Sequence, residues 1–157
     1  MTKSTALRAE NNEKHEIIFK DKRHETFYHT YLLKCWYQDV YHKALVYCLG
    51  LSEDTRNHIH QIYDFKTGCV KPECLQDGWQ TSGSQRIVRI AFNLYTDGTP
   101  STFEYDDVGG QIDETRLYSV SDLFCTGDAK YFWEAIKIRY PEYCYPVDWE
   151  VLFYAEN

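Results

Sequence analysis

The chain has 157 residues and a mass of 18.7 kDa, which is the size of a single domain. Its 17 Lys and Arg residues against 24 Asp and Glu residues give a formal net charge of −7, which argues against direct binding of nucleic acid. Hydrophobic residues make up 43% and aromatic residues 17%, so a disordered chain is excluded. No apolar run approaches the roughly 18 residues of a membrane span, and the polar N-terminus, MTKSTALRAENNEKHE, lacks the apolar core of a signal peptide. We therefore expect a cytoplasmic protein that does not bind membranes.

The first 20 residues are polar with mixed charge, which predicts a mobile tail over residues 1–20. Apolar residues recur at three- and four-residue intervals over residues 21–36, the pattern of an amphipathic helix. The same period continues over residues 40–49, where Asp39 is the expected N-cap and Gly50 the expected stop. Two helices with a short connection are therefore predicted at the start of the fold.

Two further helices are predicted before residue 96. Ser52 followed by two acidic residues is typical of a helix start, and this third helix is expected to run to about Phe65. The fourth helix is indicated by a stripe with i, i+3, i+4, i+7 spacing, formed by Ile87, Ile90, Ala91 and Leu94.

Residues 96–118 show no period and predict a long loop or a short hairpin. This segment, which we call the acidic insertion, contains six acidic residues and a single base, Arg116, so it carries most of the net charge. A short helix is expected over residues 119–125, and a longer one over residues 128–139 that ends before Pro141. The closing VDWEVLFYA, residues 147–155, alternates in part and predicts one edge strand.

These patterns together predict a mainly α protein. We expect a single compact helical domain over residues 21–157, with five or six helices and at most a small β element.

The six cysteines are expected to be free thiols, because the predicted compartment is reducing. Cys69 and Cys74 lie in a loop, TGCVKPECL, whose spacing loosely resembles half of a zinc site. The second half is missing, since His58 and His60 would point about 200° apart on a helix and cannot both face one ion. A catalytic cysteine would need a nearby base and an electropositive setting, and the sequence establishes neither. We therefore expect no metal and no cofactor.

The segment before the fourth helix is a candidate anion site, because hydroxyls and a glycine at a helix start can present backbone N–H groups to an anion. The alternative is simple helix capping by Thr81 or Ser82, with the arginines solvated or paired to acids elsewhere. The spacing is not that of a Walker or dinucleotide-binding loop. The candidate anion-binding residues are Thr81, Ser82, Gly83, Ser84, Arg86 and Arg89.

The acidic insertion is a candidate protein-binding surface. Carboxylates on an exposed segment can imitate the phosphates of a nucleic acid and occupy a basic channel, and interleaved aromatics supply anchor area. The alternative is an ordinary solvated loop. Adjacent acids in this segment also form a weak candidate metal site for a nuclease, which lacks a nearby histidine or lysine. The candidate partner-binding residues are Asp97, Phe103, Glu104, Tyr105, Asp106, Asp107, Asp113 and Glu114.

Four stretches carry a resemblance to a known group of proteins: KALVYCLGLSEDTRNHIHQIYDF, KPECLQDGWQTSGSQRIVRIAFNLY, YSVSDLFC and YFWEAIKIRYPEYC. In this order they resemble the landmarks of an uncharacterised domain-of-unknown-function family of small cytoplasmic proteins. Its members are typically encoded on conjugative elements and prophages of Firmicutes. The resemblance covers roughly residues 22–144, and the WQTSG and RYPEYC strings are its most specific parts. The chain departs from the family in its longer polar start, its acidic insertion and its tail after Cys144.

The resemblance implies an origin on a mobile genetic element and transfers no catalytic residue. Combined with the acidic charge, it favours a non-enzymatic inhibitor that binds and blocks a host defence nuclease, an anti-CRISPR type protein whose first candidate partner is a Cas9-type nuclease. A first alternative is a helical accessory protein of element maintenance or transfer that acts through protein contacts. A second alternative is a small enzyme that uses the anion site over residues 81–86 or the cysteines.

Overall fold

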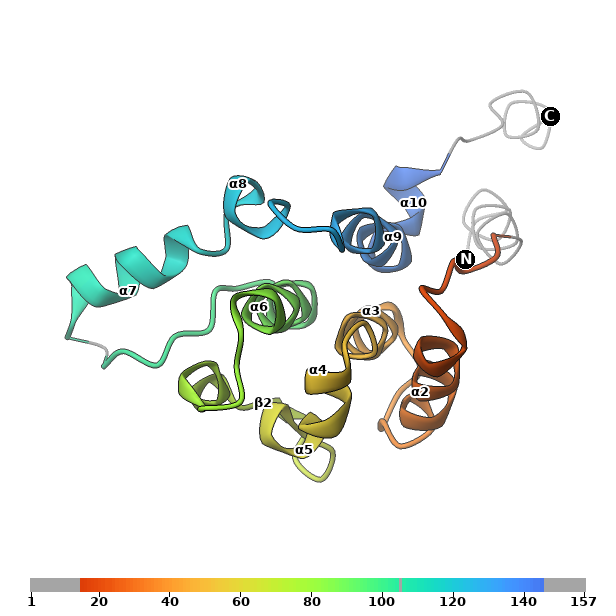
Figure 1. Ribbon diagram of the computed structural model, residues 1–157, viewed down its shortest axis with the longest axis horizontal. Helices are drawn as coiled ribbons and strands as arrows, with labels where there is room; N and C mark the ends of the chain where they lie inside the picture. Colours follow the sequence, from red (N-terminus) through yellow and green to blue (C-terminus); the bar gives the residue numbers. More distant parts are fainter. Residues whose placement is uncertain (1–14, 105, 146–157) are drawn as a thin grey trace, which may run out of the picture.

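The structure, a computed structural model, describes residues 15–104 and 106–145 (Figure 1). The described part of the chain contains nine α-helices, one 3₁₀ helix and a two-stranded hairpin, so the predicted mainly α class is confirmed. The elements in chain order are α2 (Lys22–Leu32), α3 (Val40–Leu49), α4 (Glu53–Asn57), α5 (Ile59–Ile62), β1 (Tyr63–Asp64), β2 (Cys69–Val70), η1 (Pro72–Gln76), α6 (Ser82–Thr96), α7 (Val108–Arg116), α8 (Val120–Leu123), α9 (Ala129–Arg139) and α10 (Pro141–Cys144). None of the described helices is long and apolar enough to cross a membrane.

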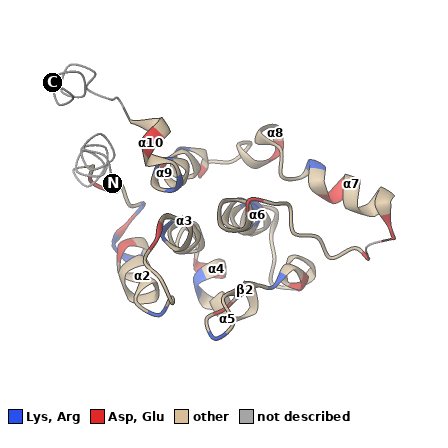
Figure 2. Ribbon diagram, turned by 180° about the vertical axis from the view of Figure 1, so that it is seen from behind, with Lys and Arg blue, Asp and Glu red and all other residues tan. Residues whose placement is uncertain are grey.

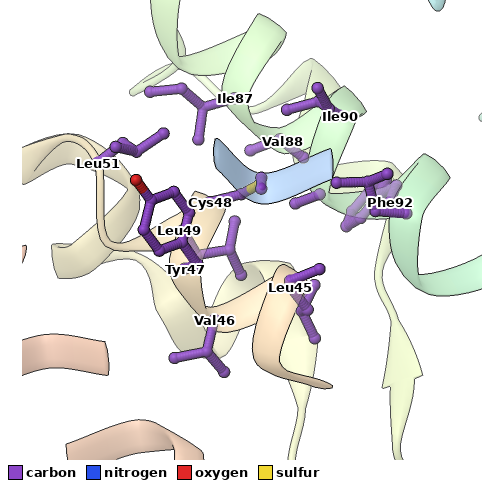
Figure 3. Close-up of a cluster of buried hydrophobic side chains, with 14 of the residues drawn as sticks. Leu45, Val46, Tyr47, Cys48, Leu49, Leu51, Ile87, Val88, Ile90 and Phe92 are labelled. Carbon is purple, nitrogen blue, oxygen red and sulfur yellow. The ribbon is translucent and has the colours of Figure 1, made fainter. Parts of the chain in front are cut away.

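Helix α3 is the centre of the core. All six residues from Ala44 to Leu49 have no solvent-exposed surface, and the helix packs against α2, α6 and α9. Figure 3 shows side chains of α3, such as Leu45 and Cys48, beside Val88 and Phe92 of α6. A helical segment that is apolar on every face must be covered by neighbouring elements on every face. The apolar segment of α3 therefore determines where its three neighbours lie.

His24 of α2 contacts α3 and is completely buried. Its Nε2 lies 2.7 Å from the carbonyl oxygen of Tyr47, and its Nδ1 accepts a hydrogen bond of 3.1 Å from the Lys20 N–H. The proton therefore sits on Nε2 and is donated to a carbonyl in the last turn of α3. Burial lowers the pKa of His24, which keeps the ring neutral.

The predicted tail over residues 1–20 is wrong for its last residues, while residues 1–14 lie outside the described part. Ile17 and Phe19 pack against the core. The Ile18 carbonyl accepts a hydrogen bond of 2.6 Å from the Tyr47 hydroxyl, and the Ile18 N–H donates one of 3.2 Å to Glu134. Three apolar residues are too few to show a period, so the sequence pattern missed a segment that is held by tertiary contacts.

The predicted third helix is interrupted. Ser52 caps α4 as expected, with the Thr55 N–H donating to its hydroxyl at 3.1 Å. The helix then breaks at His58 into α4 and α5 and continues as a hairpin in which Tyr63 pairs with Val70. This hairpin agrees with the expectation of at most a small β element, but it lies where the sequence predicts the end of a helix and a loop. The strand predicted over residues 147–155 lies outside the described residues.

The acidic insertion contains a helix, where the sequence predicts a loop or a hairpin. Asp107 caps α7 by accepting a hydrogen bond of 2.9 Å from the Gly110 N–H. The two adjacent glycines in its first turn lower helix propensity and obscured this helix. Gly110 is needed there, because a Cβ would lie 2.6 Å from Cδ1 of Phe103. In Figure 1, α7 lies at the end of the molecule opposite to α2.

Gly50→Ala tests the close packing of α2 on α3. A Cβ at residue 50 would lie 2.6 Å from Cδ2 of His24, and Gly50 has an ordinary helical backbone, so the effect is steric. We expect a loss of about 1–3 kcal/mol in the free energy of unfolding, measured with urea. Gly127→Ala is the matched control, since nothing lies within 4 Å of its Cβ position. Equal stability of the two variants would contradict the packing described for His24.

Candidate functional site

Exposed apolar side chains gather between residues 103 and 120, a segment that we call the arm. Five of the eleven large hydrophobic residues that are exposed within the described chain lie in it. Val108 and Ile112, 62% and 48% exposed, are four residues apart and share one face of α7. The five residues are Phe103, Val108, Ile112, Leu117 and Val120. A cluster of this kind on a stable domain is typical of a binding surface.

Carboxylates lie between these apolar side chains. Glu104, Asp106, Asp107 and Asp113 are all exposed, and Figure 2 shows acidic positions along α7. Asp113 forms an exposed ion pair of 3.5 Å with Arg116, a contact that stabilises little. The arm therefore presents four accessible carboxylates beside its apolar residues.

Two predicted partner-binding residues have structural roles instead, so the prediction is corrected for them. Glu114 is buried and accepts hydrogen bonds from the Ser101 hydroxyl and, at 3.1 Å, from the Thr102 N–H. Asp97 ends α6 in a left-handed conformation and pairs with Arg139 at 2.9 Å. Asp97 stays exposed although it is paired, whereas Glu114 is buried. The pattern of acids could not show either role, because the partners of both residues come from other segments. Tyr105, also predicted as a contact residue, lies outside the described residues.

The predicted anion site at the start of α6 is a capping box, as the alternative interpretation states. The Ser84 N–H donates to the Thr81 hydroxyl at 3.1 Å, and the Thr81 N–H donates to the Ser84 hydroxyl at 2.8 Å. Ser84 is also buried. These two residues are therefore used by the helix end itself, which corrects their assignment as anion ligands. Ser82 and Gly83 belong to the first turn and take no part in the box.

Arg86 and Arg89, the last two predicted anion ligands, do lie together. They line a cavity of about 190 Å³, the arginine pocket, between α6 and the connection from α7 to α8. Arg86 donates from Nε to the Asp122 carbonyl at 2.9 Å. Arg89 Nε is buried and has no hydrogen-bond partner among the described residues. The other lining residues are Ser82, Gln85, Leu117 and Asp122.

The far wall of this pocket could not be predicted from the sequence. Leu117 and Asp122 are separated from Arg86 by about 30 residues or more of chain, and no local pattern connects them. Burial of Arg89 lowers its pKa from the usual value, although the guanidinium stays charged at neutral pH. The arginine pocket thus combines two positive side chains with partial exclusion of water.

The cysteine pair is divided between core and surface. Cys74 is buried and Cys69 is exposed. Burial raises the pKa of the Cys74 thiol to about 12, which opposes the thiolate that a metal ion requires. Within the described residues, no group of three or more His, Cys, Asp or Glu side chains is placed to hold a metal ion.

A second polar cluster, which sequence analysis did not identify, joins α3, α6 and the hairpin. The buried ring of His42 lies 2.7 Å from Asp39, the N-cap of α3. The Tyr95 hydroxyl donates to the Gly68 carbonyl at 2.7 Å and lies 3.1 Å from the Tyr63 hydroxyl. These contacts fix the hairpin to the core, which gives the cluster a structural role.

Glu114→Ala tests whether this carboxylate anchors the arm. The variant leaves the Thr102 N–H and the Ser101 hydroxyl without their acceptor, so we expect a loss of about 1–3 kcal/mol in the free energy of unfolding. Amide hydrogen exchange at residue 102 should also become faster. Asp113→Ala, a neighbouring exposed acid on the same helix, should change the stability by less than about 0.5 kcal/mol. If the two variants lose the same free energy of unfolding, Glu114 does not anchor the arm.

Comparison with known proteins places the chain in a family. A search of curated proteins and a search of solved structures found no match. The family of unknown function DUF6075 matches residues 14–151, a range that includes every described helix and strand and both candidate surfaces. The chain therefore belongs to the family of unknown function DUF6075.

Proposed function

We propose that this protein acts as a binding protein without catalytic activity of its own, and that the arm is its contact surface. The observation that carries the proposal is the mixture of five exposed apolar side chains and four exposed carboxylates within residues 103–120. A few residues carry most of the affinity in protein interfaces, and burial of apolar area is the main favourable term. Carboxylates around them increase the rate of association with a basic partner.

The chemistry of the arm defines the partner that fits it. The matching surface is an apolar groove bordered by Lys and Arg residues, such as the nucleic-acid channel of a nuclease. Because Glu114 is buried and Asp97 is paired, imitation of a phosphate row rests on only the four exposed acids. The apolar residues Val108 and Ile112 therefore contribute to binding in this proposal as much as the charges do.

The specific partner that we propose is a host defence nuclease of the Cas9 type, blocked in the cytoplasm by a protein from a mobile genetic element of Firmicutes. This step rests on the resemblance of the chain to proteins of such elements and on the acidic character of the arm. An accessory protein of element maintenance or transfer would use the same surface on a different partner. The identity of the bound protein distinguishes the two.

The direct test is DNA cleavage by a Cas9-type nuclease, with the protein added before or after the guide RNA. We expect inhibition that is stronger when the protein is added first, because arm and nucleic acid compete for one channel. The double variant Val108→Ser, Ile112→Ser should weaken inhibition at least about 10-fold, since it removes two interface anchors. Its matched control changes two exposed residues elsewhere, Leu33→Ser and Tyr143→Ser, and should inhibit as the unaltered protein does.

The charges of the arm are tested by Asp106→Lys. This variant should slow association mainly at low salt, where screening is weak. Glu142→Lys makes the same charge change on α10, outside the arm, and should have a smaller effect. If the unaltered protein inhibits no defence nuclease in a panel, the nuclease part of the proposal is wrong. If a photo-crosslinker at Ile112 then captures a transfer protein, the accessory role replaces it.

A further inference from the structure

The arginine pocket borders the arm, with which it shares Leu117, and it has no role in the proposed function. It is a partly enclosed cavity of about 190 Å³. At roughly 30 Å³ for each water molecule, it holds about six waters. That space fits a phosphate group with a few further atoms.

Arg89 is incompletely paired within this pocket. Its Nε is buried, and no described residue accepts a hydrogen bond from it. The charges of Glu114 and Asp122 raise the pKa of Arg89, but neither carboxylate forms an ion pair with it. A buried donor without an acceptor costs about 1–3 kcal/mol, and more when the group is charged. The two Nη groups of Arg89 also have no partner among the described residues, but they are not buried, so a ligand in the cavity can accept hydrogen bonds from them.

Arg86 is held in place beside Arg89. Its Nε donates to the Asp122 carbonyl at 2.9 Å and its Nη1 to the Ser82 carbonyl at 3.4 Å. Its Nη2 has no partner among the described residues. Asp122 is the only acidic side chain in the lining, and its carboxylate accepts a hydrogen bond of 2.9 Å from the Ser119 hydroxyl. The lining therefore carries a net positive charge in a protein of charge −7.

We propose that the arginine pocket binds the phosphate group of a small phosphorylated metabolite. Guanidinium groups donate two parallel hydrogen bonds to a phosphate, and a phosphate with two negative charges matches two arginines. Ser82 and Gln85, which also line the cavity, can bond the hydroxyls of such a molecule. The backbone N–H groups at the N-terminus of α6 are not proposed as phosphate ligands, because the capping box already uses the Ser84 N–H.

The position of the pocket gives the ligand a second effect. One wall belongs to α6, and the other is formed by Leu117 at the end of α7 and Asp122 in α8. A bound phosphate would join these walls. Amide hydrogen exchange over residues 117–123 should therefore become slower when the ligand binds.

The test is a titration of ¹⁵N-labelled protein with inorganic phosphate and with glycerol 3-phosphate, observed at the arginine Nε–Hε signals. We expect saturable shifts of the Arg89 signal with a Kd of roughly 1 mM or lower. Chloride at equal ionic strength should not reproduce them. The proposal is overturned if the unaltered protein shows no saturable shift, or if chloride produces an equal one. This outcome does not depend on any variant.

Variants then locate the site. Arg89→Gln should abolish binding, and Arg89→Lys should weaken it at least about 10-fold, because lysine keeps the charge but loses the paired donors. Arg116→Gln is the control, since this arginine is exposed on α7 and is absent from the lining. Equal phosphate binding by Arg89→Gln would contradict the assignment. Tighter binding of acetate or succinate than of phosphate would identify a carboxylate site and overturn the choice of ligand.

Discussion

The complete burial of residues 44–49 of α3 is the constraint on which the rest of the structure depends. A helix whose residues 44–49 have no exposed surface needs neighbours on every side, and α2, α6 and α9 supply them. His24 completes the end of the helix by donating to the Tyr47 carbonyl, and Gly50 leaves room for its ring. Placement of α6 against this core in turn determines where its two arginines lie.

The arm is attached by few apolar contacts and by several polar ones. Tyr118 is buried in the core, and polar bonds add to this link, including those of Glu114 and the 2.7 Å bond from the Tyr118 hydroxyl to the Pro100 carbonyl. Five other apolar side chains of the arm are exposed to solvent. The two parts of the molecule therefore differ. Apolar burial around α3 makes a rigid body, while the arm exposes apolar area and charge that a partner can contact.

Much of the helical framework could be predicted from local patterns. The stripes of α3 and α6 and the caps Asp39, Ser52 and Thr81 all depend on residues within one or two helical turns. The features that could not be predicted depend on distant segments. They are the hydrogen bond from the Tyr47 hydroxyl to the Ile18 carbonyl, the burial of Glu114 and the far wall of the arginine pocket, and each requires knowledge of how the helices meet. Helix α7 was missed for a local reason, the weak helix propensity of its two glycines.

Native-state amide hydrogen exchange, measured against denaturant, tests most directly whether a rigid body around α3 carries a separately attached arm. The account predicts that amides of α3 exchange only through global unfolding, with an opening free energy equal to that of the whole domain. Amides of α7 should exchange through a local opening of clearly lower free energy that denaturant hardly changes. If α7 opens only together with α3, or if α3 opens before α7, the division between rigid body and arm is contradicted.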